Sequence, residues 1–296
     1  MPLGISFYTL QAASYLIDVY RGKYKASRNP VKVILYLIFF PTVVEGPISR
    51  FDEVGEQLYS GHKLSYKNVT FGLQLIFWGL FKKLVIAARA DILVKNVFSN
   101  YGQYSGIIIM LSVLLYTIQI YAEFSGCMDI AVGSAKMFGI ALPQNFRQPF
   151  FSTSVNEFWR RWHITLGAWL RDYVFYGASL SGWYKKFTAM IRKHLSEGAV
   201  KLILPLPVLF LVWFGNGLWH GADIKYIMYG MYYFFIMCMG MFFEAPFAII
   251  NSKLRIDTKT RGYRIFQVIR TFVLVNIGML MFRADSLNTA WQMFLS

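Results

Sequence analysis

Two of the four histidines lie in apolar, aromatic sequence, where an ionisable side chain is costly. His163 follows a pair of arginines in "FWRRWHITLGAWLRDY" (158–173), and His220 lies near the end of "FGNGLWHGAD" (214–223). An imidazole whose pKa is about 6.5 can take a proton from a hydroxyl and return it to a leaving group. The two histidines therefore indicate group-transfer chemistry.

The segment around His163 has helical spacing, and it predicts one amphipathic helix. Its aromatic stripe and its polar face repeat every three or four residues. The stripe holds Trp159, Trp162, Leu166, Trp169 and Tyr173, and the polar face holds Arg160, His163, Gly167 and Arg171. Glu157 and Arg161, four residues apart, are expected to pair. The polar face either lines a cavity or lies at the lipid headgroups, with His163 bonded to a carbonyl.

The segment around His220 ends a long apolar stretch with Asn216, Gly217, Gly221 and Asp223, so the backbone can turn there and the imidazole can face a cavity. A metal site using His220, Asp223 and His163 is the competing interpretation. We expect no metal, because neither HExxH nor clustered Cys and His ligands occur.

The segments that must position these residues have the composition of a membrane protein. Hydrophobic residues make up 56% of the chain and charged residues 15%. The uncharged runs 105–122, 202–219 and 226–243 predict membrane spans, and shorter or interrupted runs raise the expected number of membrane segments to six to eight.

The net charge of +15 does not indicate nucleic-acid binding, because Lys and Arg gather in loops beside apolar segments. The positive-inside rule places the basic loops 21–32, 183–201 and 251–264 in the cytoplasm, with His220 near an outward turn. Within the second loop, "WYKKFTAMIRKHLSEG" predicts an amphipathic surface helix, and anionic lipid is an available partner for such loops. His194 in that loop and His62 in another polar loop are expected to be solvated.

Two stretches are expected to be non-helical at membrane depth. In 39–51, Pro41, Gly46 and Pro47 surround Glu45 and would break a helix. In 121–150, small residues alternate with charged ones, which predicts close packing beside a polar cavity. We therefore expect an all-α, polytopic bundle with re-entrant or in-plane helices, forming a single domain over 1–296.

Six stretches of the chain resemble blocks of a known family, in that family's order. They are "PLGISFYTLQAASYLIDVYRG" (2–22), "FFPTVVEGPISRF" (39–51), "YAEFSGCMDIAVGSAKMFGIALPQNFRQPF" (121–150), "NEFWRRWHITLGAWLRDYVF" (156–175), "GLWHGA" (217–222) and "FVLVNIGMLMFRADSL" (272–287). The chain resembles the membrane-bound O-acyltransferase (MBOAT) family. The resemblance is to the bacterial branch of alginate and peptidoglycan O-acetyltransferases and teichoic acid D-alanyl-transfer proteins.

The resemblance implies roles for the residues above. His220 would be the catalytic histidine and His163 a second histidine across a central tunnel. We expect His220 to act as general base on an acceptor hydroxyl that attacks an acyl thioester; an acyl-histidine intermediate is the other mechanism. Asn216, Arg160, Arg171 and Trp219 are candidate substrate-binding residues.

The resemblance also implies substrates, partners and a location. It predicts transfer of an acyl group, most simply acetyl, from a cytoplasmic thioester (acetyl-CoA or an acyl-carrier protein) to hydroxyls of an extracytoplasmic polysaccharide or cell-envelope polymer. We expect no tightly bound cofactor, a multi-pass place in the plasma membrane, and an esterase-like acyltransferase partner outside. D-alanyl transfer for teichoic acid modification and a non-enzymatic transporter or flippase are the alternatives. Several helices precede the first block in the family and the last helical region is longer there, so we expect this chain to be truncated at both ends.

Overall fold

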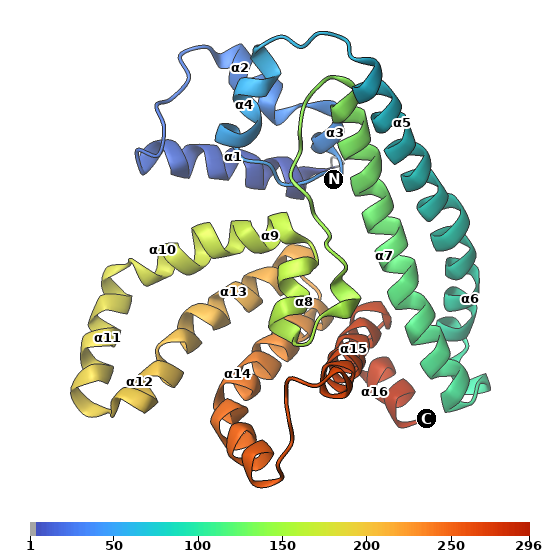
Figure 1. Ribbon diagram of the computed structural model, residues 1–296, viewed down its shortest axis with the longest axis vertical. Coiled ribbons are helices and arrows are strands. Elements are labelled where there is room, and N and C mark those ends of the chain that lie inside the picture. Colours follow the sequence, from blue (N-terminus) through green and yellow to red (C-terminus); the bar gives the residue numbers. More distant parts are fainter. Residues whose placement is uncertain (1–3) are drawn as a thin grey trace. The chain divides into compact units, whose positions relative to one another are not determined.

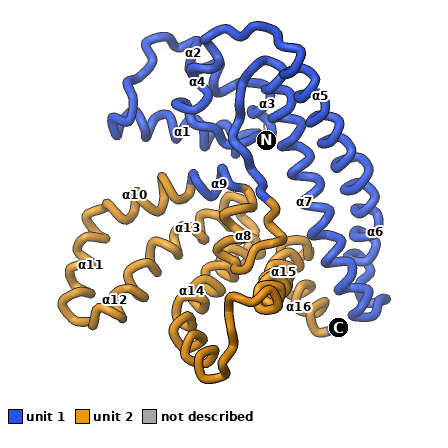
Figure 2. Tube along the Cα trace, in the orientation of Figure 1, with its two compact units in different colours: residues 1–147, 164–169, 296 blue, residues 148–163, 170–295 orange. Residues whose placement is uncertain are grey.

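The computed structural model describes residues 4–296, and their regular structure consists of helices without a strand (Figure 1). The chain divides into two compact units (Figure 2). Unit 1 holds residues 1–147, 164–169 and 296, and unit 2 holds residues 148–163 and 170–295. The predicted all-α fold is confirmed, whereas the single domain and the central tunnel stay predictions. Pro2 and Leu3, which open the first family-like block, lie outside the described residues.

Five helical segments of the described chain are long and apolar enough to cross a membrane. They are Tyr66–Ser99, Gly106–Met137, Glu197–His220, Ile224–Lys253 and Arg261–Arg283. The three predicted spans overlap the second, third and fourth of them, which confirms a polytopic membrane protein. Six to eight segments were expected from the sequence, and the difference comes partly from the apolar run 33–44, which is divided between two short helices.

The described residues of unit 1, from Gly4 onward, form nine helical elements besides a single turn at Tyr101–Gln103. In chain order they are α1 (Ile5–Tyr20), α2 (Pro30–Leu37), α3 (Phe40–Val43), α4 (Phe51–Tyr59), α5 (Tyr66–Leu80), the π-helix η1 (Phe81–Ala87), α6 (Ala88–Ser99), α7 (Gly106–Met137) and α9 (Ile164–Trp169). The last of these returns to unit 1 after the chain has entered unit 2.

Helices α5 and α7 lie side by side because glycines let their backbones meet (Figure 1). A Cβ added to Gly79 would lie 2.5 Å from the carbonyl oxygen of Gly126, and one added to Gly133 would lie 2.6 Å from the carbonyl oxygen of Gly72. Small residues at such contacts are typical of helix pairs in membranes. The close packing predicted from the small residues of 121–150 is therefore confirmed.

Charged side chains at this helix pair bind one another. Lys82 Nζ lies 2.7 Å from Asp129 Oδ2 and donates to Ser125 Oγ at 2.9 Å. Lys83, the next residue of η1, pairs with Glu123. Each ammonium thus meets a carboxylate of α7, which reduces the cost of holding charge in membrane-spanning helices.

The expectation of a non-helical segment over 121–150 is wrong for 121–137, which continue α7 without a break. The charges of this stretch do not disrupt the helix because η1 supplies their counter-charges. Helix α7 ends where Gly139 adopts a φ of +80° and its N–H donates to the carbonyl oxygen of Lys136 at 2.9 Å. Glycine in the left-handed region is a common end of a helix.

The predicted break in 39–51 is confirmed, since α3 ends at Val43 and residues 46–50 have no helical structure. Polar groups of the broken backbone find partners inside unit 1. Tyr36 Oη donates to the carbonyl oxygen of Ser49 at 2.7 Å, and the N–H of Ile48 donates to Thr165 Oγ1 at 3.0 Å.

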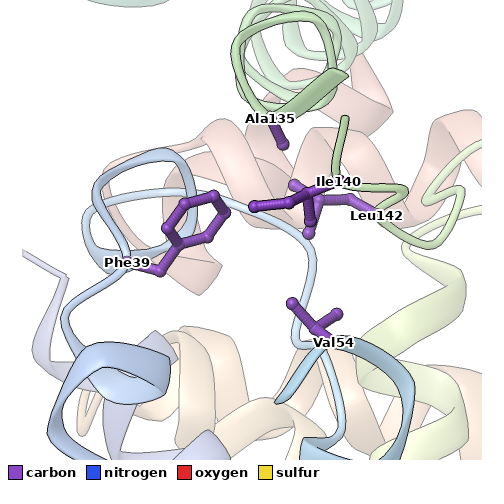
Figure 3. Close-up of a cluster of buried hydrophobic side chains, with 5 residues drawn as sticks. All are labelled: Phe39, Val54, Ala135, Ile140 and Leu142. Carbon is purple, nitrogen blue, oxygen red and sulfur yellow. The ribbon is translucent and has the colours of Figure 1, made fainter. Parts of the chain in front are cut away.

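A small hydrophobic core packs the chain on either side of residues 46–50 against the end of α7 and the residues that follow it. Figure 3 shows Ile140 and Leu142 among Phe39, Val54 and Ala135.

Unit 2 contains the remaining helices. In chain order they are η3 (Pro149–Phe151), α8 (Val155–Arg161), the π-helix η4 (Leu170–Phe175), α10 (Tyr176–Ser179), α11 (Gly182–His194), α12 (Glu197–Ile203), α13 (Pro205–His220), α14 (Ile224–Lys253), α15 (Arg261–Arg283) and α16 (Leu287–Leu295). The helix predicted from "WYKKFTAMIRKHLSEG" is confirmed as α11, while its place on the membrane surface stays a prediction.

Helices α13 and α14 form a tight antiparallel pair (Figure 1). A Cβ on Gly230 would lie 2.2 Å from the carbonyl oxygen of Trp213, and one on Gly217 would lie 2.5 Å from that of Tyr226. The buried core beside this pair contains Trp213 and Tyr233. These contacts hold the C-terminal end of α13, and with it His220, against α14.

Candidate active site

His220 is the last residue of α13, and the chain turns directly after it. Gly221 has a φ of +155°, which side-chain-bearing residues rarely adopt, and a Cβ there would lie 2.8 Å from the ring of Tyr226. Asp223 then caps α14 by accepting a hydrogen bond from the N–H of Lys225 at 2.9 Å. The turn predicted after His220 is thus confirmed, with its glycine and its capping aspartate.

His163 lies in a break between two helices, so the predicted single helix over 158–173 is wrong. Helix α8 ends at Arg161 and α9 begins at Ile164. His163 itself has a φ of +48°, which is uncommon for a residue other than glycine. A residue other than glycine whose backbone is held in this conformation is often part of a functional site.

The physical reason for the break is Asn145. The N–H of Ile164 donates to the carbonyl oxygen of Asn145, and the N–H and Oγ1 of Thr165 donate to its Oδ1, each at 3.0 Å. These hydrogen bonds replace those that a continuous helix would make with α8. Asn145 is 19 residues before Ile164, so helical spacing around His163 carries no sign of it.

The two histidines belong to one cluster of rings in unit 2. The Trp219 ring lies 5.4 Å from His163 and 4.9 Å from His220, measured between centroids, and both contacts are edge-to-face. His163 is 4% exposed and His220 is half-buried. The structure therefore brings together the two histidines that the sequence singled out.

Two aromatic residues complete the surroundings of His220. Phe282 of α15 lies 5.0 Å from the imidazole and Tyr229 of α14 lies 5.9 Å from it, between ring centroids. Neither residue was among the predicted site residues. Phe282 does lie in the family-like block 272–287, which was the available signal, whereas Tyr229 lies in a run that indicates only a membrane span.

Helix α8, which precedes His163, is anchored by Glu157. The backbone N–H and the hydroxyl of Thr153 each donate to Glu157 Oε2 at 2.8 Å, and Arg161 Nη2 donates to Oε1 at 2.6 Å. Burial opposes ionisation of this carboxyl, but the hydrogen bonds from Thr153 and the charge of Arg161 outweigh it and lower the pKa of Glu157. The predicted pair of Glu157 and Arg161 is confirmed.

The two arginines predicted to share a face with His163 do not form one face with it, because the helix is broken. Arg160 is exposed on α8. Arg171 is exposed on η4, where its Nε donates to Asp172 Oδ1 at 2.9 Å. Their proposed part in substrate binding stays a prediction.

Three buried polar atoms near the histidines have no hydrogen-bond partner in the described part of the chain. They are Asn216 Oδ1, Trp213 Nε1 and Trp159 Nε1. Asn216 lies one turn before His220 on α13, and the rings of Trp159 and Trp213 are 5.0 Å apart. Buried polar atoms are normally paired, so this acceptor and these donors are suited to a bound molecule.

The arrangement supports acid–base chemistry in an apolar setting. Two imidazoles share one aromatic neighbour, and one amide oxygen lies a helical turn away.

The sequence profile of the membrane-bound O-acyltransferase family matches residues 26–191, more than half of the chain. The chain belongs to the MBOAT family. The matched range includes the position of His163.

Three curated relatives illustrate this similarity. The "Probable alginate O-acetylase AlgI" of Pseudomonas syringae pv. tomato is 34% identical over 294 residues, which are 99% of this chain and 51% of the relative. The "Peptidoglycan O-acetyltransferase" of Helicobacter pylori is 28% identical and covers 98% of this chain and 55% of the relative. The "Teichoic acid D-alanyltransferase" of Bacillus subtilis is 28% identical, with 95% and 68% covered. The chain thus spans about half the length of the first two MBOAT relatives.

Proposed function

We propose that this MBOAT protein is an O-acyltransferase that moves an acetyl group from a cytoplasmic thioester to hydroxyls of an extracytoplasmic polysaccharide or cell-envelope polymer. Family membership and the names of the relatives support acyl transfer to envelope polymers. The observation that carries the proposal is the pair of histidines joined through Trp219 in one ring cluster. The plasma membrane, crossed several times, is the proposed location.

In the proposed reaction His220 is the general base. Its imidazole takes the proton of the acceptor hydroxyl while the hydroxyl oxygen attacks the thioester carbonyl carbon. The carbon–sulfur bond then breaks, and the imidazolium returns the proton to the departing thiolate. The products are an ester and a free thiol, and no metal or oxidant is needed. General acid–base catalysis of this kind contributes roughly a hundredfold to ten-thousandfold to the rate.

The neighbours of His220 have distinct proposed roles. Trp219 packs against both imidazoles and holds them in position. Asn216 Oδ1 is a hydrogen-bond acceptor without a partner in the described chain, which suits a donating hydroxyl better than an oxyanion. His163 orients the substrate or stabilises developing charge. Arg160 and Arg171 are exposed and remain candidates for the anionic part of the donor.

D-alanyl transfer is the second candidate. It is favoured by the Bacillus subtilis relative, of which the chain covers 68%. The acetyl group is preferred because identity to the alginate O-acetylase is higher, at 34% against 28%. Acetyl-CoA or an acyl-carrier protein as donor, and an esterase-like partner outside, are parts of the same proposal.

The test replaces each histidine in the protein as its host makes it. His220→Ala and His163→Ala should remove the ester groups of the cell envelope, measured as acetate and D-alanine released by mild alkali. The exposed His62→Ala and His194→Ala are matched controls and should leave the ester content unchanged. Unchanged ester content in both site variants, at normal protein levels, would refute the proposed function. Release of D-alanine instead of acetate would establish the second candidate.

A further inference from the structure

One end of unit 2 is strongly basic. Helix α14 returns antiparallel to α13 and is joined to α15 by a loop over 254–260, so the start of α12–α13, the end of α14 and the start of α15 lie at one end (Figure 1). Residues 183–201 contribute five exposed basic side chains and residues 251–264 contribute another five, with Glu197 and Asp257 as their acidic residues. The ten are Lys185, Lys186, Arg192, Lys193, Lys201, Lys253, Arg255, Lys259, Arg261 and Arg264.

The opposite end of the same helices has no such excess. The turn between α13 and α14 and the segment after α15 together carry Asp223, Lys225, Arg283 and Asp285, two acidic and two basic residues. The excess of basic residues in unit 2 is therefore confined to one end of these helices.

Helix α11 at the basic end also has an exposed apolar stripe. None of its residues is buried, and Trp183 and Met190 are 48% and 53% exposed. These two residues are seven apart, so they lie on one side of the helix, with the half-buried Phe187 between them. The basic residues also repeat every seven positions. Lys185 and Lys186 are followed seven residues later by Arg192 and Lys193.

The position of α11 points to its partner. It ends at His194, and the candidate span Glu197–His220 begins three residues later. A chain of three residues reaches at most about 10 Å, so the end of α11 lies close to the surface of any membrane that this span crosses. Apolar side chains on one side and basic ones on the others are typical of a helix lying in the headgroup region.

We propose that the basic end of unit 2 binds anionic phospholipid headgroups and that α11 lies in the headgroup plane. Trp183 and Met190 insert toward the acyl chains, while the lysines and arginines of α11 and of 251–264 contact phosphate groups. Each basic side chain near an anionic surface strengthens binding by roughly fivefold. This surface does not depend on the acyltransferase reaction, so it can be tested without an activity assay.

The experiment measures amide hydrogen exchange of α11 in the full chain, reconstituted in nanodiscs. One set contains phosphatidylcholine alone and the other phosphatidylcholine with phosphatidylglycerol. Exchange over α11 should be roughly tenfold or more slower with phosphatidylglycerol, and added salt should reduce the difference. The variant K185Q/K186Q/R192Q/K193Q should lose the difference. The charge-preserving variant K185R/K186R/R192K/K193R should retain it.

Two results would overturn the proposal. Equal exchange of α11 in the two nanodisc types would show that anionic headgroups are not recognised. Slow exchange that requires an added acidic carrier protein, whatever the lipid, would assign the basic end to a protein partner instead. Because all four substituted side chains are exposed, loss of folding should not obscure the outcome, and the exchange of the α13–α14 pair is the internal control.

Discussion

In unit 1 two lysines of the spanning helices form ion pairs, whereas in unit 2 the two histidines are surrounded by aromatic rings. Lys82 and Lys83 each meet a carboxylate of α7. By contrast, Asn216 Oδ1 is buried without a hydrogen-bond partner in the described chain. Paired charges stabilise a fold, whereas a buried acceptor without a partner is suited to a hydrogen bond from a bound molecule. The comparison contrasts paired charges in α7 and η1 of unit 1 with an unpaired acceptor one helical turn from His220 in unit 2.

The largest stability effect should come from breaking a pair in unit 1. Lys82→Met leaves Asp129 without its counter-charge and should lower the free energy of unfolding by about 3 to 5 kcal/mol. The matched control is Lys95→Met, which removes an ion pair to Asp91 from a lysine whose side chain is 66% exposed, and should cost less than about 1 kcal/mol. Thermal unfolding in detergent measures both. Equal losses would mean that burial does not set the value of these pairs.

The next effect concerns the glycine contact that holds α13 against α14 in unit 2. Gly230→Ala places a Cβ against the carbonyl oxygen of Trp213 and should cost about 3 kcal/mol, with a loss of ester formation because His220 shifts. Gly240→Ala on the same helix meets nothing within 4 Å and should leave stability equal or up to about 1 kcal/mol higher. Unfolding midpoints and ester content are measured for both variants. Similar midpoints would contradict the expectation that the contact at Gly230 holds α13 against α14.

Two asparagines sharpen the contrast between the units. Asn145→Leu in unit 1 removes bonds to Thr165 and should destabilise by about 2 kcal/mol. Asn216→Leu in unit 2 removes an unpaired acceptor, so the unfolding midpoint should stay or rise while ester formation falls. A lower midpoint for Asn216→Leu together with unchanged ester formation would assign Asn216 a structural role.

The smallest effect is a pH dependence at α8. Because the folded protein lowers the pKa of Glu157 below 4.5, this group contributes stability above pH 4.5, and the contribution is lost as pH falls through the lower, folded pKa. As the pH falls below 4.5, the unfolding temperature of Glu157→Gln should therefore drop less than that of the unchanged protein. The two drops should differ by roughly a few degrees. Parallel midpoint curves for the two proteins would show that Glu157 does not contribute in this way.

Local patterns predicted much of the fold, and distant partners account for what they missed. The spans in α7, α13 and α14, the surface helix α11 and the pair of Glu157 and Arg161 follow from composition and short spacing. The helix expected over 158–173 is broken where Thr165 donates hydrogen bonds to Asn145. The non-helical stretch expected over 121–150 is helical over 121–137, where η1 supplies counter-charges to α7. Both errors arise where a residue far along the chain supplies the partner.

The sequence by itself determined that this is a helical membrane protein of the MBOAT family with two unusual histidines. Apolar runs and block order are local properties, so they need no tertiary contact to be recognised. Only the tertiary structure decided that His163 lies in a helix break, that Trp219 packs against both imidazoles, and that Tyr229 and Phe282 surround His220. The physical reason is that packing joins residues from the break after α8 and from α13, α14 and α15, which no periodicity along the chain relates.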